Sequence, residues 1–416
     1  MRLAYITRAY PFAHLGETFL APEIRALASL CEELHVIPVR PHLRKSTLES
    51  APEAVRGVRI AVASPQMLRA ALTEALTHPR GALRALSALI APRYRTSAML
   101  KNLVLFPAAL AVAHYVRTHD IEHIHAHWLT TPATVAYLAS LMTGVPWSCT
   151  AHAHDIFSGN LIRQKVASAR FVRAIARRNL QSLADLSGCS GESLYLIHVG
   201  VEVAPAPCPQ SLKRPLQIVC PARLDPIKGH EYLIRGLATA RDNGLAFQCD
   251  IVGTGPSEPQ IRSLVSRLHL EDAVSIRGLV RHNALLHDLG RGRYDVVVLA
   301  SLEFDEGAGH EGIPVALIEA MARGVPCIST ATGCIPELID ADTGVLVPQR
   351  DHDSLAAAFM RLEADPTMRR KLGAAARARV MAHYDIAKTA RDLYGLIDAG
   401  GPRRAQGTAN VASAGH

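Results

Sequence analysis

The sequence has few aromatic side chains, no paired cysteine motif and no long uninterrupted apolar run. Aromatic residues make up only 5% of the 416 residues and no recognised nucleic-acid-binding motif occurs, which argues against a nucleic-acid partner. The eight cysteines include no C-x-x-C pair and lie mostly in apolar runs. This pattern favours buried, reduced thiols over disulfides or zinc ligands.

The sequence also lacks an apolar run long enough to predict a membrane-spanning helix or a signal peptide. A spanning helix needs about 20 apolar residues. The best candidate, Leu103 to Ala113, is shorter and contains Pro107. Residues 1–20 have no continuous apolar core of the signal-peptide type. The sequence therefore predicts a cytoplasmic protein.

The net charge of +8 is concentrated in one part of the chain. Between Arg44 and Arg117 there are eleven Lys or Arg residues and three acidic residues, which accounts for the whole excess. Two interpretations of residues 44–117 stay open. This basic, helix-rich segment could be attracted to an anionic membrane leaflet or a lipid pyrophosphate acceptor, or it could be a solvated helical surface.

Length and pattern predict two α/β domains. The chain is long enough for two separate cores. A helix, a Gly stop, Val-Pro and a strand occur twice, around Gly144 and around Gly324, as expected for two similar doubly wound domains. The predicted division is 1–203 for the first domain, 204–215 for a proline-rich linker, 216–384 for the second domain, 385–398 for a helix that returns to the first domain and 399–416 for a disordered tail.

The stretch from His310 to Gly324 predicts a loop followed by a helix, after an apolar strand at 294–301. Pro314 suits the first helical position, because its missing N–H would be unpaired there in any case. Gly324 suits the left-handed residue that ends a helix. The start of this helix is then a place where backbone amides can hold a phosphate; those amides belong to Gly312, Ile313 and Val315.

Two carboxylates, Glu311 and Glu319, flank this anion site. They would repel an anion unless they accept hydrogen bonds from hydroxyl groups on the same ligand. A nucleotide-diphosphate sugar has that combination of hydroxyls and diphosphate. Taken alone, two Glu residues at this spacing are common and are also compatible with an ordinary loop residue and a solvated helix residue.

Residues 311–326, Glu-Gly-Ile-Pro-Val-Ala-Leu-Ile-Glu-Ala-Met-Ala-Arg-Gly-Val-Pro, resemble the E-x7-E segment of the retaining glycosyltransferases of family 4. The likeness looks closest to the exopolysaccharide and colanic-acid-type bacterial enzymes and runs from Tyr10 to Pro348. It implies an α/β fold of the GT-B type, with two facing Rossmann-like domains and an active-site cleft between them. It also implies a UDP- or GDP-sugar donor, a saccharide acceptor that is expected to be lipid-linked, and no metal or other cofactor.

Arg223 and Lys228 lie on a predicted strand-to-helix loop. A forked cation and a point cation suit the charge that develops on a leaving diphosphate. The loop resembles the family segment G-R-L-x-x-x-K-G, with Ala222 in place of the first glycine. The resemblance therefore implies that both cations act in the reaction.

Three glycines are expected near the donor. Gly253 lies in a segment that could be mistaken for a dinucleotide fingerprint, but Glu258 occupies the third glycine position, so NAD binding is disfavoured. The resemblance implies that Gly253 lines the nucleotide pocket and that Gly278 supplies backbone near the base. Gly16, on the loop after the first strand, is expected to let backbone approach the diphosphate or the acceptor.

Histidines gather at two predicted strand ends. His123, His125 and His127 alternate and would share one face of a strand, which allows either a metal site or a structural role. The resemblance implies the structural role and no metal. It also implies that His152, at the end of the next strand, contacts the donor sugar, although a structural histidine with satisfied hydrogen bonds is also compatible with the pattern.

The predicted catalytic residues are thus His152, Arg223, Lys228 and Glu311. The predicted donor-binding residues are Gly16, Arg223, Lys228, Gly253, Gly278, Gly312, Ile313, Pro314, Val315 and Glu319. Two other functions stay open at this point. One is a nucleotide-sugar epimerase or hydrolase on the same fold, and the other is a catalytically inactive nucleotide-sugar-binding protein of polysaccharide assembly.

Overall fold

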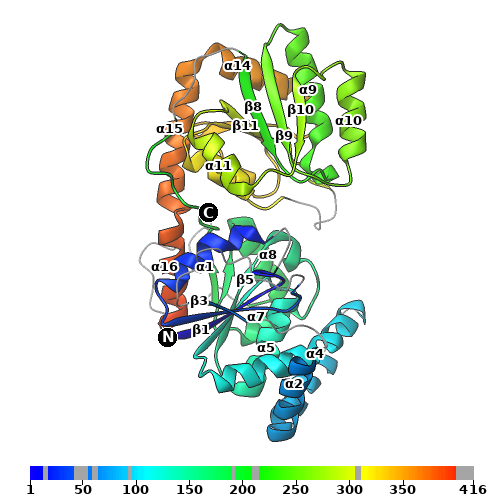
Figure 1. The fold of residues 1–416 in the computed structure, drawn as a ribbon, viewed down its shortest axis with the longest axis vertical. Helices are drawn as coiled ribbons and strands as arrows, with labels where there is room; N and C mark the ends of the chain where they lie inside the picture. The colour runs from blue at the N-terminus through cyan, green and yellow to red at the C-terminus, as the bar shows by residue number, and fades with distance from the viewer. Residues whose placement is uncertain are drawn as a thin grey trace. The chain divides into compact units, whose positions relative to one another are not determined.

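The structure is a computed structural model that describes residues 1–12, 17–41, 55–58, 64–91, 96–189, 193–208, 215–304 and 311–399. The chain forms two compact units (Figure 1). Unit 1 contains residues 1–200 and the chain from Ile386 onward, and unit 2 contains Val201–Asp385. Of the segment 204–215, predicted as a linker, the described residues 204–208 and 215 belong to unit 2, where the Cys208 N–H donates to the Arg323 carbonyl at 2.7 Å.

Unit 1 is built on a parallel sheet in the order β3-β2-β1-β4-β5-β6-β7. The chain starts at β1, moves outward to β3 and then returns to place β4 on the other side of β1. The strands are β1 Arg2–Thr7, β2 Glu33–Pro38, β3 Val55–Gly57, β4 His123–His127, β5 Trp147–Ala151, β6 Val172–Ala174 and β7 Leu194–Leu196. This order reverses direction between β1 and β4.

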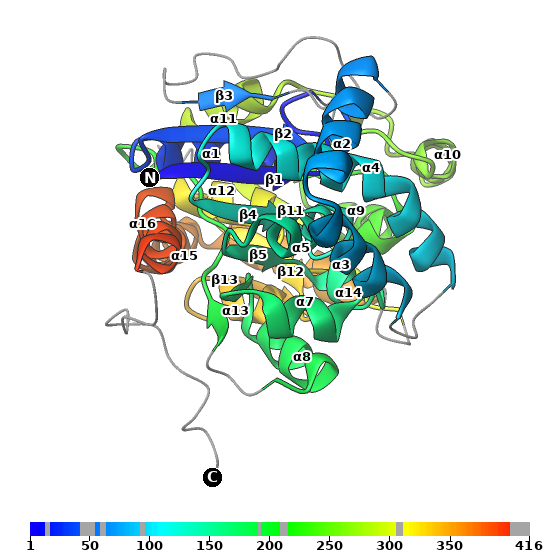
Figure 2. The ribbon, with the colours of Figure 1, turned by 90° about the horizontal axis from the view of Figure 1, so that it is seen from below.

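The helices of unit 1 cover both faces of its sheet. α2, α3 and α4 pack against one another and lie side by side in Figure 2, and α16 packs on α1. The helical segments are η1 Thr18–Leu20, α1 Ala21–Ala28, α2 Pro65–Thr77, α3 Pro79–Ile90, α4 Thr96–Thr118, α5 Thr131–Thr143, α6 Ala153–Ile156, α7 Ile162–Ser168, α8 Arg177–Ser187 and α16 Ile386–Asp398.

β1 shows why the sheet needs a helical layer on each side. Ala4 and Ile6 belong to the core that includes α4 and α5, whereas Leu3 and Tyr5 belong to the core that includes α1 and α16. Successive side chains of a strand point to opposite faces of the sheet. A strand buried on both faces therefore has a nearly continuous apolar sequence, as residues 3–6 do.

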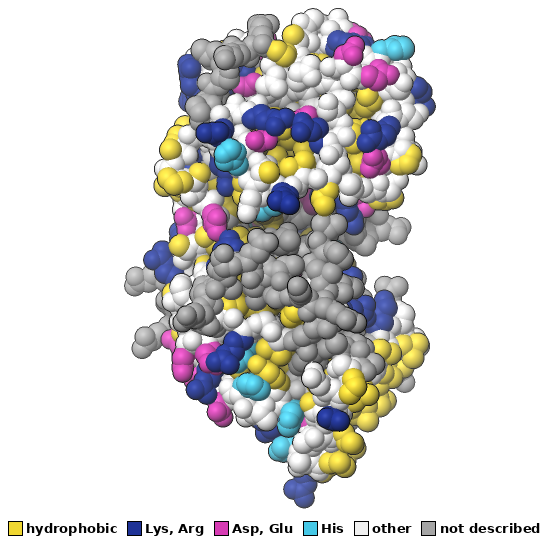
Figure 3. All heavy atoms as spheres, viewed as in Figure 1, with side chains coloured by type: hydrophobic (Ala, Val, Ile, Leu, Met, Phe, Trp, Pro, Cys, Tyr) yellow, Lys and Arg dark blue, Asp and Glu magenta, His cyan; other side chains and the backbone are white. Residues whose placement is uncertain are grey.

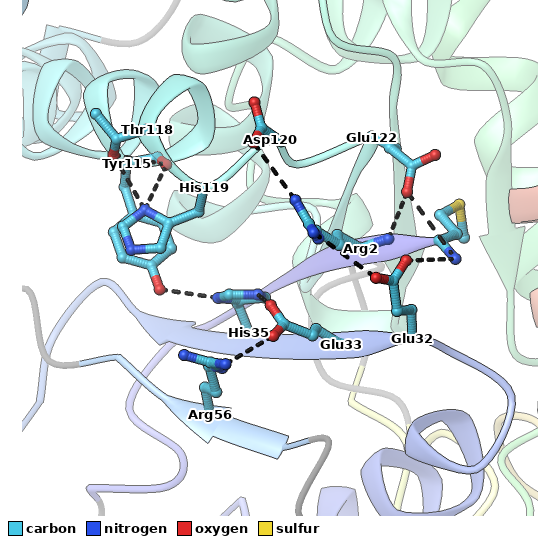
Figure 4. Close-up of polar contacts among 11 residues, drawn as sticks. Arg2, Glu32, Glu33, His35, Arg56, Tyr115, Thr118, His119, Asp120 and Glu122 are labelled. Atoms are coloured by element: carbon cyan, nitrogen blue, oxygen red, sulfur yellow. Dashed lines mark hydrogen bonds and ion pairs between the residues drawn. The ribbon is translucent and has the colours of Figure 1, made fainter.

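Polar contacts hold the amino-terminal side of the unit 1 sheet (Figure 4). The Arg2 backbone N–H donates to Glu122 Oε2 at 2.6 Å, and the Arg2 guanidinium lies 3.4 Å from Asp120 Oδ2. On β2, a ring nitrogen of His35 lies 2.8 Å from the Tyr115 hydroxyl of α4, which ties the sheet to that helix. In open parallel sheets ligands bind at the opposite, carboxyl edge.

α4 is longer than the sequence analysis predicted. It has 23 residues and continues through Pro107, and its best 18-residue window has a mean hydropathy of 1.5. By length and composition it could cross a membrane, so the prediction that no segment is long enough is wrong. One side of the helix, including Leu105 and Ala109, belongs to the core of unit 1, while the other carries exposed Leu100 and Val104.

Unit 2 repeats the arrangement with a parallel sheet in the order β10-β9-β8-β11-β12-β13. The strands are β8 Leu216–Pro221, β9 Phe247–Val252, β10 Val274–Gly278, β11 Val296–Leu299, β12 Cys327–Thr330 and β13 Gly344–Val347. The helical segments are η3 Pro226–Lys228, α9 His230–Asp242, α10 Glu258–Arg267, α11 His282–Gly290, α12 Val315–Ala322, α13 Ile335–Leu338, α14 His352–Ala364 and α15 Pro366–His383. Here the order reverses between β8 and β11.

The repeated Gly-Val-Pro segment occupies the same topological position in both units. Gly144 follows α5, between the fourth and fifth strands of unit 1, and Gly324 follows α12, between the fourth and fifth strands of unit 2. Both glycines adopt positive φ, 79° and 76°. The prediction of two similar doubly wound domains is confirmed.

Gly229, at the start of α9, lies where the loop after β8 packs closely against the loop after β11. Its φ is +63°, and a Cβ there would lie 1.8 Å from the Ala300 carbonyl oxygen. Gly229→Ala is expected to lower the free energy of unfolding by about 3 kcal/mol, because backbone strain and a clash combine. Gly244→Ala is the control, since Gly244 has φ +88° and no described atom within 4 Å of such a Cβ.

The control variant is expected to lose about 1 kcal/mol, from the left-handed strain alone. Urea unfolding of the two variants measures the difference. Equal losses would contradict the close approach of the two loops.

Candidate active site

The loops that follow β8 and β11 are joined at the carboxyl edge of the unit 2 sheet. β8 leads through Arg223 into the short turn η3, which ends at Lys228. The Leu302 N–H, after β11, donates to the Ile227 carbonyl at 2.8 Å. Because these two strands are neighbours at the reversal of strand order, their loops form one surface at the usual ligand position of such folds.

Lys228 and Glu311 form an ion pair on this surface. The Lys228 Nζ contacts Glu311 Oε2, and the Ser301 hydroxyl donates to the same oxygen at 3.3 Å. Their side chains are 19% and 15% exposed. The Cys334 N–H donates to the Glu311 carbonyl at 3.1 Å, which fixes the backbone of the glutamate. The structure thus brings together two of the predicted catalytic residues.

Arg223 points elsewhere. Its guanidinium pairs with Asp225 Oδ2 at 2.6 Å, and its side chain is 69% exposed. Asp225 also caps η3 by accepting from the Ile227 N–H. Arg223 is therefore held at the edge of the β8 loop, and among the described residues no ion pair or hydrogen bond joins it to Lys228 or Glu311.

Glu319 has a partner that the sequence analysis missed. The carboxylate is largely buried on α12, and its Oε1 lies 2.7 Å from Nε2 of His282, the first residue of α11. This hydrogen bond raises the pKa of His282. His282 follows β10 by only a few residues, and its position after a strand is a signal that could have identified it.

The predicted anion site precedes α12. The helix begins at Val315 with Pro314 as its N-cap, so Pro314 lies one residue before the first helical position and that detail of the prediction is wrong. Because the ψ of Pro314 is 122°, which is extended and not helical, Pro314 is the last residue of the loop before α12. Gly312 and Ile313 lie on that loop, and the first amides of any helix lack partners within the helix.

Gly253 and Gly278, two of the predicted donor-binding glycines, lie where backbone segments of unit 2 meet. Gly253 has φ +147°, and a Cβ there would lie 2.0 Å from the Ala222 carbonyl oxygen. Its N–H donates to the Gly278 carbonyl at 2.8 Å, which joins the ends of β9 and β10. Both glycines therefore lie at the same carboxyl edge as Lys228. Gly16 lies outside the described residues.

His152 lies in unit 1, directly after β5. Its Nε2 is 2.8 Å from Nε2 of His127, and its ring centroid is 4.1 Å from that of Trp128. Burial lowers the pKa of His152 well below its usual range, so the ring is neutral at physiological pH. The Asp155 carboxylate accepts from the His152 N–H at 2.8 Å and fixes the backbone at this point.

Glu17 organises the loop after β1, next to His152. One carboxylate oxygen accepts from the Ala9 and Tyr10 N–H groups, each at 2.7 Å, and the other accepts from Trp128 Nε1 at 2.6 Å. The sequence analysis chose Gly16 and passed over this neighbour. No local pattern distinguishes Glu17, because its partners come from two separate segments.

Two of the alternating histidines of β4 form hydrogen bonds with the neighbouring strand β5. His123 Nε2 and His125 Nδ1 each lie 2.8 Å from the Ser148 hydroxyl of β5, and His125 Nε2 lies 3.0 Å from the Thr150 hydroxyl. Within the described part of the chain, no group of three His, Cys, Asp or Glu residues could hold a metal ion. The contacts agree with the structural role that the resemblance implied.

Residues 209–379, which make up most of unit 2, match the family described as glycosyl transferases group 1. Most of unit 2 is therefore similar to a group 1 glycosyltransferase domain. The Lys228–Glu311 pair and Glu319 all lie inside it.

Similar proteins have related names. The chain is 36% identical over 225 residues to the putative colanic acid biosynthesis glycosyltransferase WcaL of Escherichia coli K12, covering 51% of this chain and 52% of WcaL. It is 32% identical over 214 residues to the amylovoran biosynthesis glycosyltransferase AmsK of Erwinia amylovora, covering 51% and 52%. The chain spans about half the length of these curated relatives.

A solved structure agrees over almost the whole chain. Anabaena Alr3699/HepE in complex with UDP-glucose matches with a TM-score of 0.70 at 17% identity, covering 96% of this chain and 100% of that one. At this identity the likeness shows the fold. Two Rossmann-like units of the GT-B type are present, as predicted.

The His282–Glu319 bond generates a pH-dependent prediction. Because the pKa of His282 is raised in the folded protein, its stabilisation is complete below the unfolded pKa of about 6.5 and is lost as the pH rises through the folded value. His282→Gln should therefore cost more stability at pH 5.5 than at pH 9. Since His282 is 42% exposed, solvent screening keeps the difference below about 1 kcal/mol.

Urea midpoints at the two pH values measure this effect. The control is His287→Gln, which changes the more exposed histidine of the same helix, 63% exposed. A cost that is the same at both pH values would contradict the pairing.

Proposed function

We propose that the protein is a retaining glycosyltransferase that moves a sugar from a nucleotide-diphosphate sugar to a saccharide acceptor. The observation that carries the proposal is the Lys228–Glu311 ion pair at the reversal point of the sheet in the group 1 domain. The names of WcaL and AmsK support a role in exopolysaccharide or cell-envelope glycan synthesis. The donor is a UDP- or GDP-sugar, and the UDP-glucose bound to HepE supports the former.

The diphosphate of the donor would displace Glu311 from the Lys228 ammonium group. Lys228 is largely shielded from water, and reduced screening strengthens its attraction for an anion. Arg223, on the same loop, would exchange Asp225 for a second phosphate oxygen. Backbone groups before α12, at Gly312 to Val315, complete the phosphate site. These groups supply the positive potential, so the proposed reaction requires no metal ion.

Retention is proposed from the resemblance of residues 311–326 to the E-x7-E segment of the retaining glycosyltransferases, which suggests that no enzymic nucleophile attacks the anomeric carbon. We therefore assign front-side attack, in which the acceptor oxygen bonds to the anomeric carbon as the bond to the diphosphate breaks, and the leaving diphosphate takes the proton of the acceptor hydroxyl. Glu319 would bind hydroxyls of the nucleotide ribose, and Gly253 and Gly278 would line the nucleotide pocket. His152 would contact the donor sugar.

Two other functions make different use of the same site. A nucleotide-sugar epimerase or hydrolase would release free nucleotide without an acceptor, and an inactive binding protein would release none. The presence of Arg223, Lys228, Glu311 and Glu319 together supports turnover over binding alone, because an inactive site would tend to lose some of them. Acceptor-dependent release of nucleotide separates the three.

Glu319→Ala is expected to weaken binding of the cognate UDP or GDP by about 10- to 100-fold, the worth of a hydrogen bond to a charged group. Lys228→Ala is expected to lower kcat more than affinity, because its charge acts mainly on the departing diphosphate. Calorimetry and steady-state kinetics measure the two effects. Glu271→Ala, at an exposed position before β10, is the control. Unchanged affinity in Glu319→Ala would refute its assigned role.

The acceptor and the location are proposed from a surface of α2, α3 and α4, here called the α2–α4 surface. It carries large exposed apolar side chains, and Figure 3 shows apolar side chains gathered over α2 and α4. These side chains are Leu68, Leu72, Leu76, Leu83, Ile90, Leu100 and Val104. Exposed cations lie between them, at Arg69, Arg80, Arg84 and Lys101. Leucines with interspersed cations suit an anionic lipid surface.

We therefore place the protein at the inner face of the cell membrane, with a lipid-linked acceptor. The solvated-surface interpretation explains the cations but not the leucines, of which Leu72 is 61% and Leu76 72% exposed. The one acidic side chain described on α2, Glu74, is buried and paired with Arg117, so it does not oppose an anionic surface.

Vesicle sedimentation tests this location. The wild-type protein is expected to bind phosphatidylglycerol vesicles and to bind phosphatidylcholine vesicles weakly. Replacing both Leu72 and Leu76 with Glu should reduce binding by at least about tenfold, because buried leucines are each worth more than 1 kcal/mol. Leu279→Glu, at a residue of unit 2 that is 63% exposed, is the control. Equal binding by both variants would contradict the assignment of the α2–α4 surface.

A further inference from the structure

The Glu319 carboxylate of unit 2 has one oxygen held by the protein and one oxygen open to solvent. Glu319 lies in the second turn of α12, and its Oε1 is 2.7 Å from Nε2 of His282, at the start of α11. No residue that the structure describes donates a hydrogen bond to the other oxygen, Oε2. Oε2 is also not one of the buried side-chain atoms that lack a partner, so it reaches solvent.

The bond to His282 sets the orientation of this carboxylate. Because a carboxylate can only accept, Nε2 of His282 carries the proton of the bond. The terminal torsion of a glutamate side chain is broad when nothing holds it. With Oε1 bonded to His282, rotation about that torsion is restricted. Oε2 therefore keeps a defined position at the surface of unit 2.

The packing of α11 on α12 has a separate support in Arg323. This buried side chain lies one turn after Glu319 and donates to the Glu319 carbonyl at 2.9 Å and to the Leu286 carbonyl of α11 at 3.1 Å. By contrast, the His282 side chain is 42% exposed. Exposed polar pairs contribute little to stability. Arg323, and not His282, is therefore the main polar link between the two helices.

His282 belongs to the segment that leaves the carboxyl edge of the unit 2 sheet. It follows Gly278, the last residue of β10, by four positions. The Gly278 carbonyl accepts from the Gly253 N–H at 2.8 Å, and the proposed function assigns both glycines to the nucleotide pocket. One short segment thus carries a backbone group of that pocket and the donor that orients Glu319.

We propose that His282 is a positioning residue of the nucleotide site, which holds Oε1 of Glu319 so that Oε2 accepts a hydrogen bond from a hydroxyl of the nucleotide ribose. The inference rests on the proposed function, because that function brings a nucleotide to unit 2. It involves residues of unit 2 alone. His282 acts through Glu319 and is not assigned to touch the ligand. A nucleotide that lacks this hydroxyl should therefore bind equally well with and without His282.

Calorimetry of the full-length protein with deoxynucleotides tests the ribose contact. The probes are the tighter ligand of UDP and GDP, and the forms of it that lack the 2′- or the 3′-hydroxyl. The wild-type protein is expected to bind one deoxy form at least about tenfold more weakly, because a hydrogen bond to a charged group is lost. Glu319→Ala should bind that deoxy form and the ribonucleotide with similar affinity.

His282→Ala tests the positioning role. It should weaken binding of the ribonucleotide about fivefold, because Oε2 loses its fixed position. Binding of the weaker deoxy form should not change, since that ligand has no hydroxyl for Oε2. His282→Gln should restore most of the affinity, because the glutamine side chain can also present an N–H to Glu319. The control is His287→Ala, at the more exposed histidine of α11, which should change neither affinity.

Equal losses for the ribonucleotide and the deoxy form in His282→Ala would overturn the positioning role, because damage to the fold affects both ligands alike. No loss for either ligand, or a Gln variant as weak as the Ala variant, would also contradict it. If the wild-type protein binds both deoxy forms as tightly as the ribonucleotide, the ribose contact is wrong. If it binds neither UDP nor GDP, the proposed function fails together with this inference, whereas normal wild-type affinity with an unaffected Ala variant contradicts this inference alone.

Discussion

The reversal of strand order in each sheet is the constraint on which the candidate sites depend. In both units the first strand lies between the second and the fourth, so the loops after the first and fourth strands leave the sheet as neighbours. In unit 2 this places Lys228, after β8, against Glu311, which follows β11. In unit 1 it places the Glu17 loop, after β1, against Trp128 at the end of β4. The same topology thus produces a polar surface twice.

The two surfaces have different electrostatic character. The unit 2 surface presents a Lys–Glu pair, an exposed Arg223 and a helix start, which are groups that respond to an anion. The unit 1 surface presents the neutral imidazole of His152. The Glu23–Arg173 ion pair of this unit is buried. A buried ion pair is stable only when every polar atom has a partner. The donors to Glu23, the Tyr5 hydroxyl and the Arg173 guanidinium, meet that condition.

Much of the fold could be predicted from local pattern. Parallel strands buried on both faces have continuous apolar sequences, and the two Gly-Val-Pro segments mark equivalent turns with positive φ. The errors have local causes. Pro314 was placed inside α12 because proline suits the first turn, yet its extended ψ makes it the N-cap. α4 was judged too short because Pro107 was taken as a break, but the helix continues through it.

The sequence by itself determined which residue types end each strand, because burial and turn chemistry act over a few residues. Together with the resemblance to a known family, it predicted Lys228, Glu311, Glu319 and His152 as site residues. Only the tertiary structure decided their partners. Glu311 meets a lysine 83 residues away, and Glu23 meets an arginine 150 residues away, because strand order determines which strand ends are neighbours. Apolar periodicity reports that a residue is buried, but it carries no information about which distant polar group shares its environment.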